Sequence, residues 1–139
     1  MRRAPVGLAL LLAACDGAVT DELTISDARI SAPLGGRDVT AAYFTLDSGG
    51  APDALVTASS PEAGFIEIHR SSRENGIARM ERVERLDIPV GETVFERGGL
   101  HLMVFGVAQD ALADGEMEIT LEFDSGQTRT EAFRVETSG

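Results

Sequence analysis

The sequence predicts an all-β domain, built as an antiparallel sandwich or barrel. Short runs of apolar and β-branched residues alternate with polar residues, and nearly every break between the runs carries Gly, Pro, Asp or Ser. No long amphipathic helix interrupts this pattern. Many short strands at such a spacing are typical of sandwiches and barrels. A chain of 139 residues has the length of a single domain.

The candidate strands follow one another closely along the chain. The clearest is Phe65 to Arg70, in which Ile66 and Ile68 alternate with polar residues. Pro33 to Gly36 is a turn between two of the others, and residues 108–112 suggest a helical turn. In chain order, the predicted strands cover residues 23–30, 41–46, 53–58, 65–70, 77–83, 93–96, 100–107, 117–123 and 130–135.

The N-terminus has the features of an export signal. A basic start is followed by an apolar stretch, residues 4–12, which is shorter than the roughly 20 residues of a membrane-spanning helix. The sequence Leu12-Ala13-Ala14-Cys15 then resembles the lipobox of bacterial lipoproteins, which implies that Cys15 is acylated and becomes the first mature residue. We therefore expect a lipoprotein signal peptide at 1–14, a lipidated cysteine and tether at 15–21, and a β domain at 22–136.

The residue after the cysteine indicates where the anchor lies. Several acyl chains on Cys15 would hold the protein stably on a membrane, because a single chain gives only marginal binding. Asp16 resembles the retention signal of the enterobacterial sorting rule. The expected location is the periplasm, with the lipid anchor in the inner membrane.

Charge and cysteine usage exclude some classes of partner and scaffold. The formal charge is −11, and after removal of residues 1–14 Lys+Arg falls from 12 to 10 while Asp+Glu stays at 23, which gives −13. Because an acidic surface repels phosphate backbones, we expect no nucleic acid partner. Cys15 is the only cysteine, so no disulfide forms within the chain. We expect a monomer.

Strand periodicity places histidine and methionine side chains together. Leu100, Leu102 and Val104 share the apolar face of one strand, so His101 and Met103 share the opposite face and can reach one ion. By the same parity His69 lies opposite the apolar face of its own strand.

Imidazole and thioether groups together favour copper in its reduced state. Thioether sulfur is a soft ligand that selects Cu(I), and methionine is unusual at zinc sites. A blue-copper centre needs a thiolate, which this chain lacks outside its processing site. Each residue also has a simpler interpretation, since a lone strand histidine is usually a surface residue and a strand methionine is usually core. We expect the core position for Met117.

Three segments carry a family resemblance. They are Ile66-Glu67-Ile68-His69, then Met80, then Gly98-Gly99-Leu100-His101-Leu102-Met103, with ten residues between His69 and Met80 and twenty between Met80 and His101. This pattern resembles the periplasmic copper chaperones of the PCu(A)C family, over roughly residues 23–135. Arg97 departs from the family, which often has proline there, and the C-terminus lacks the His- and Met-rich tail of some members.

The resemblance implies a fold, a site and a task. The fold is a cupredoxin-like Greek-key β-sandwich or barrel. The site is a surface-accessible one in which His69, Met80, His101 and Met103 bind one Cu(I) ion. The task is delivery of copper to a respiratory oxidase subunit, typically for its CuA centre, or to another copper chaperone, without enzymatic activity. Met80 would follow a loop at residues 71–75 and swing in.

Two other functions stay open at this point. Copper storage or scavenging would use the same site. A β-sandwich lipoprotein that binds a protein partner would carry a vestigial site, with the four side chains too far apart for coordination. Glu67 shares the face of His69, and two roles are open for it: support of a metal ligand from outside the site or, as we expect, an ordinary solvated carboxylate.

Overall fold

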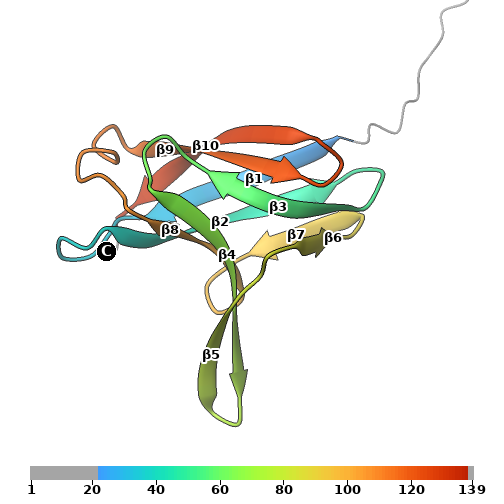
Figure 1. The fold of residues 1–139 in the computed structure, drawn as a ribbon, viewed down its shortest axis with the longest axis horizontal. Coiled ribbons are helices and arrows are strands. Elements are labelled where there is room, and N and C mark those ends of the chain that lie inside the picture. The colour runs from blue at the N-terminus through green and yellow to red at the C-terminus, as the bar shows by residue number, and fades with distance from the viewer. Residues whose placement is uncertain (1–21, 138–139) are drawn as a thin grey trace, which may run out of the picture.

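The computed structural model describes residues 22–137, which form ten β-strands in one mixed sheet (Figure 1). The described part of the chain contains no helix. The strands are β1 (Leu23–Ser31), β2 (Val39–Ser48), β3 (Asp53–Ser59), β4 (Phe65–Glu74), β5 (Ile77–Arg82), β6 (Leu86–Ile88), β7 (Gly91–Phe95), β8 (Leu100–Phe105), β9 (Glu116–Phe123) and β10 (Thr128–Glu136). The all-β prediction is confirmed.

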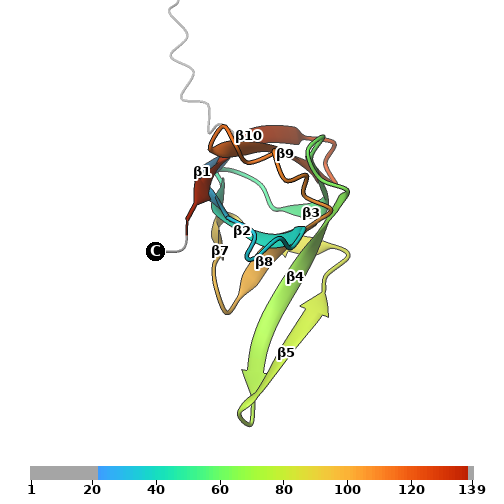
Figure 2. The ribbon, with the colours of Figure 1, turned by 90° about the vertical axis from the view of Figure 1, so that its left-hand side faces the viewer.

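The sheet curls into a barrel, which Figure 2 shows end-on. Its strand order is β5-β4-β8-β7-β2-β1-β10-β9-β3-β6, and β2 also pairs with β8. Most pairs are antiparallel, while β1 runs parallel to β10 and β7 meets β8 in a single parallel pair. β3 and β4 lie side by side where the two ends of the sheet come together, without being paired in the sheet. The barrel leaves β4 and β8 adjacent along their full common length.

The core fills the barrel with the alternate side chains of its strands. Phe44 is fully buried, stacks on Phe95 with ring centroids 4.2 Å apart, and meets the edge of Phe133 at 5.5 Å. Such aromatic pairs add to the stabilisation from buried area. Met117 is also fully buried, which confirms the core position expected for it. The apolar faces predicted for β4 and β8 point inward, with Ile68, Leu102 and Val104 in the core.

The predicted strands agree with the observed ones, apart from their ends and one omission. β6 was missed because three residues are too few to display an alternating pattern. The expected helical turn at 108–112 is a series of turns, closed by hydrogen bonds from Ala111 N–H to the Ala108 carbonyl and from Ala113 N–H to the Asp110 carbonyl. No described helix is long and apolar enough to cross a membrane. The signal peptide, Cys15 and the tether lie outside the described residues.

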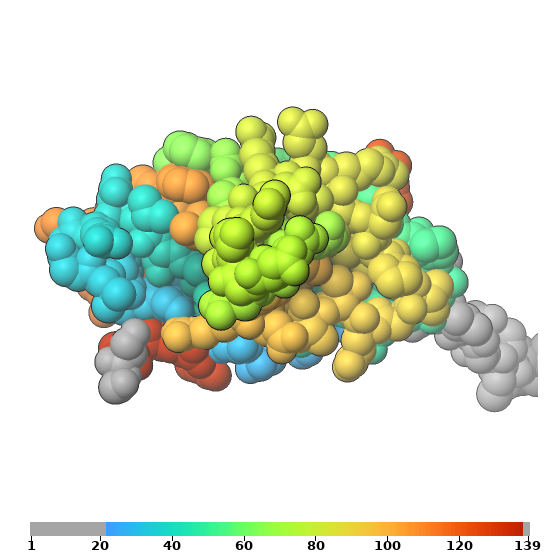
Figure 3. Space-filling view, turned by 90° about the horizontal axis from the view of Figure 1, so that it is seen from below, coloured from blue at the N-terminus to red at the C-terminus, as the bar shows by residue number. Residues whose placement is uncertain are grey.

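The prediction of a loop at residues 71–75 is wrong. β4 continues to Glu74, and a two-residue turn at Asn75 and Gly76 leads directly into β5. Both turn residues have positive φ, 50° and 77°, as the type I′ turn of a tight hairpin requires, and Asn-Gly is the sequence that favours it. The β4–β5 hairpin projects from the barrel in Figures 1 and 2 and covers the middle of the face shown in Figure 3. Met80 therefore sits on a defined strand.

Candidate metal centre

The two histidines face each other across β4 and β8. His69 and His101 are directly opposite in the antiparallel register, so both side chains project from the same face of the sheet. Their ring centroids are 5.7 Å apart and the ring planes are inclined by 61°. Their neighbours Ile68 and Leu102 point into the core, so the rings lie on the outer face of the barrel. The long-range pairing of two strands thus joins residues that are far apart in the sequence.

The two methionines reach the same face from either side of His69. Met103 is opposite Glu67, which places it diagonal to His69 on β8. Met80 is opposite Ser71, which places it diagonal to His69 on β5. Diagonal neighbours in a sheet are about 7–8 Å apart, within reach of a long side chain. All four predicted residues therefore lie on one continuous patch of the outer face, over three adjacent strands.

The four side chains of this patch differ in exposure. His101 is buried, with only 5% of its surface exposed, whereas Met80 is 55% exposed. The His69 side chain is 13% exposed and Met103 is half-buried. β8 lies inside the sheet between β4 and β2, whereas β5 is an edge strand of the projecting hairpin. The patch thus has a covered imidazole at its base and an exposed thioether at its rim.

The hydrogen bonds of His101 leave one ring nitrogen available. Its Nδ1 lies 3.1 Å from the carbonyl oxygen of Gly99, which can only accept, so Nδ1 carries the proton. In the neutral ring the lone pair is then on Nε2. Burial lowers the pKa of His101, as does the nearby His69, while the hydrogen bond to Gly99 acts in the opposite direction. A neutral imidazole is the form that binds metal ions.

The surroundings of His69 differ from those of His101. Its Nε2 lies 2.8 Å from a carboxylate oxygen of Glu67, and its Nδ1 is buried without a hydrogen-bond partner. The Glu67 side chain is only 21% exposed and also lies 3.7 Å from Nε of Arg82. The expectation that Glu67 is an ordinary solvated carboxylate is therefore wrong. Strand parity had placed it beside His69, but the contact itself depends on side-chain rotamers that the sequence does not reveal.

The donors in this patch fit a soft monovalent ion. Two imidazoles and two thioethers are neutral and soft or borderline ligands, which suit Cu(I). Within residues 22–137, no three His, Cys, Asp or Glu side chains gather in a way that could hold a metal ion. A buried ring nitrogen without a partner is costly unless something binds it, so the orphaned Nδ1 of His69 fits a metal-binding nitrogen.

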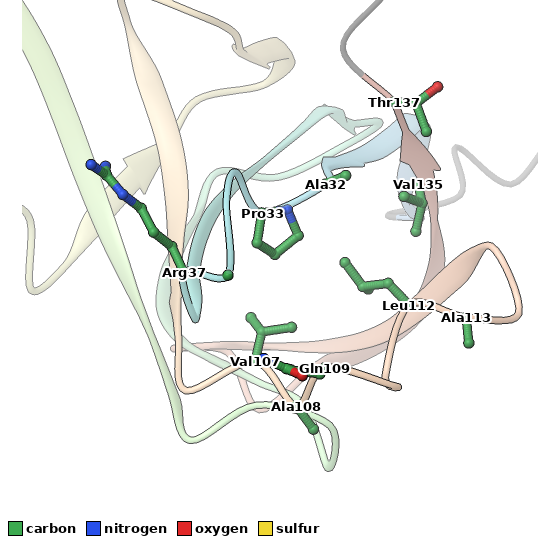
Figure 4. Close-up of a pocket in the computed structure, with 11 residues that line it drawn as sticks. Ala32, Pro33, Arg37, Val107, Ala108, Gln109, Leu112, Ala113, Val135 and Thr137 are labelled. Atoms are coloured by element: carbon green, nitrogen blue, oxygen red, sulfur yellow. The ribbon is translucent and has the colours of Figure 1, made fainter.

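A separate cavity of about 520 Å³ lies at one end of the barrel (Figure 4). Its lining is mostly apolar and includes Pro33, Val107, Leu112 and Val135, with Arg37 as its charged residue. It includes none of the four predicted ligands. The candidate metal centre is therefore an open patch on the sheet and does not depend on this cavity.

Comparison with known proteins shows which family the chain is part of. Residues 23–135 match the LpqE-like family model, whose description reads "Putative lipoprotein LpqE-like". The chain belongs to the LpqE-like family. A curated relative, the uncharacterized protein RP573 of Rickettsia prowazekii, is 33% identical over 98 residues, which cover 68% of this chain and 54% of that protein. The chain thus spans about half the length of the curated relative that it matches.

Solved structures show the same fold. The copper-bound PCuAC domain from PmoF2 is 21% identical, with 87% of this chain and 97% of that chain covered and a TM-score of 0.69. The solution structure of CuI-DR1885 from Deinococcus radiodurans is 30% identical, with 81% of this chain and 76% of that chain covered and a TM-score of 0.65. The resemblance to PCu(A)C proteins and the cupredoxin-like fold predicted from the sequence are confirmed.

Proposed function

We propose that the domain is a copper chaperone that binds one Cu(I) ion through His69, Met80, His101 and Met103. The observation that carries this proposal is the face-to-face pair of histidines on the outer face of the barrel, flanked on both sides by methionines. Two similar structures hold copper by their own description, one of them as Cu(I). The strand register also supports it, because all four residues share one face over three adjacent strands, as a common site requires.

The gradient of exposure across the patch supports transfer by ligand exchange. Met80 is exposed on the rim and His101 is buried at the base. An acceptor would add its first ligand on the open side and replace Met80 first. His69 and Met103 would follow, and His101 would release the ion last. Because the ion keeps some ligands throughout, it need not enter water. No covalent bond in the protein changes, and we assign no enzymatic activity.

The recipient is proposed to be a respiratory oxidase, at its CuA centre, or another copper chaperone. The domain would work in the periplasm, held at the inner membrane by acylated Cys15. The lipobox-like sequence before Cys15 supports the anchor, as does the description of the matched family, "Putative lipoprotein LpqE-like". Loss of CuA in a deletion strain, corrected by added copper or by the wild-type gene, would support delivery. Normal CuA loading in that strain at limiting copper would instead support storage or scavenging.

Competition for Cu(I) with a chelator of known affinity tests the site. The variant with His101→Ala and Met103→Ala should lose competitive binding, because it lacks one imidazole and one thioether of the patch. The control variant, Glu92→Ala with Val94→Ala, has the same spacing on the neighbouring strand β7, where both side chains are exposed. It should bind as wild type does. Wild-type affinity in the first variant would show that copper binds elsewhere.

A further inference from the structure

If the patch binds copper as proposed above, His69 must present one of its two ring nitrogens to the ion. We propose that Glu67 is a positioning residue, which holds the proton of His69 on Nε2 and so presents Nδ1 as the copper-binding nitrogen. Glu67 and His69 are two residues apart on β4, so both side chains project from the same face. The 2.8 Å contact between the Glu67 carboxylate and Nε2 is a charge-assisted hydrogen bond.

The position of the proton follows from the chemistry of the two groups. An ionised carboxylate can only accept a hydrogen bond, so Nε2 of His69 must be the donor. In the neutral ring the lone pair is then on Nδ1. This nitrogen is buried and has no hydrogen-bond partner in the described structure, so nothing in the protein competes for its lone pair. A carboxylate that accepts from the remote ring nitrogen of a ligand histidine is a common way of orienting metal ligands.

Arg82 forms an ion pair with the other oxygen of the carboxylate. Its Nε lies 3.7 Å from Oε1 of Glu67, while Oε2 is the oxygen that contacts His69. Arg82 lies directly opposite His69 on β5 and two residues from Met80. The positive charge of Arg82 offsets the negative charge of the Glu67 carboxylate. The pair therefore adds no net charge beside the four metal donors. The Arg82–Glu67–His69 chain also ties the strand that carries Met80 to the histidine pair.

The two histidines would then bind through different nitrogens. Gly99 holds the proton of His101 on Nδ1, whereas Glu67 holds the proton of His69 on Nε2. His101 would therefore use Nε2 and His69 would use Nδ1. The alternative is that copper binds Nε2 of His69 and displaces Glu67. That alternative predicts the opposite behaviour of the Nε2 proton, so the two can be separated.

The test begins with the metal-free protein and ¹⁵N-labelled histidine. In the wild type, NMR should show His69 protonated on Nε2, with an Nε2–H signal protected from exchange. Glu67→Ala should lose that protection, and Glu67→Gln should keep it, because the amide oxygen can still accept. Glu81→Ala is the control, since it removes an exposed acid opposite Arg70 on the other face of the same hairpin. A wild-type His69 with its proton on Nδ1, or an unchanged signal in Glu67→Ala, would overturn the proposal.

The second stage adds Cu(I), which is diamagnetic. The Nε2–H signal of His69 should persist in the loaded protein, and Glu67→Ala should weaken binding by about 10–100-fold, as loss of such an orienting group typically does. Loss of the Nε2–H signal on loading, or tighter binding by Glu67→Ala, would show that Glu67 competes with copper. Equal binding by Glu67→Ala would show that Glu67 does not position His69 for copper, and it would also overturn the proposal. If the wild type binds no Cu(I), the proposed function fails, while the metal-free spectra still decide the role of Glu67.

Discussion

Two methionines allow metal binding and stability to be separated. Met80 is 55% exposed on an edge strand, whereas Met117 is fully buried in the core. Both lie in strands, and both lose the same atoms when changed to alanine. Met80→Ala removes a proposed ligand and Met117→Ala removes core packing. The two substitutions should therefore affect different measurements.

The expected magnitudes follow from burial. Met117→Ala leaves a cavity among fully buried neighbours and should cost about 2–5 kcal/mol of unfolding free energy. Met80→Ala changes an exposed side chain away from the core and should stay within about 0.5 kcal/mol. Its Cu(I) affinity should fall at least as far as the roughly 10–100-fold that loss of an orienting group costs, because a ligand itself is lost.

Urea unfolding and Cu(I) competition, measured on both variants under conditions in which each is folded, make the comparison. The expected pattern is a normal unfolding midpoint with weakened copper binding for Met80→Ala. Met117→Ala should show a lowered midpoint with the affinity of its folded form retained. Wild-type copper affinity in Met80→Ala would refute its place in the donor set. A large loss of stability in the same variant would refute the description of Met80 as exposed.

Three further predictions concern the fold that supports the patch. Burial lowers the pKa of His101, so this histidine binds a proton more readily in the unfolded chain than in the folded one. The contribution of neutral His101 to the free energy of unfolding is therefore fully present above the unfolded pKa of about 6.5, and it falls as the pH drops towards the lower pKa of the folded state. Urea unfolding midpoints should decrease as the pH is lowered through this range, and they should decrease less in His101→Gln. An equal decrease in His101→Gln would show that other groups cause the pH dependence. Gly76→Ala puts a side chain at a φ of 77° with open space around it, so strain alone should cost about 1–2 kcal/mol in the hairpin, detectable as faster amide exchange in β5. Unchanged exchange would contradict the turn geometry. Phe44→Ala removes the ring that stacks on Phe95 and meets the edge of Phe133, and it should cost about 3–5 kcal/mol by urea unfolding. A cost below about 1 kcal/mol would contradict the central place of Phe44 in the core.

Local periodicity accounts for the parts of the site that could be predicted from sequence. Alternation along one strand depends only on the two-residue repeat of the backbone, so it placed His101 and Met103 together and Glu67 beside His69. The same repeat identified most strands and the apolar faces that form the core. It could not detect β6, whose three residues are held by their pairing with β3. It also mistook the end of β4 for a loop, because the polar residues of a projecting hairpin lack a buried face.

The sequence by itself determined the donor types, the strand parity that pairs His101 with Met103, and the family to which the chain belongs. Only the tertiary structure decided that His69 lies opposite His101, that His101 is buried, and that Glu67 contacts His69. Parity is local, because it follows from backbone geometry. The pairing of β4 with β8 and the burial of a side chain depend on how the whole barrel closes. The proposed copper site therefore rests on residues that the sequence predicts and on a strand register that only the folded barrel provides.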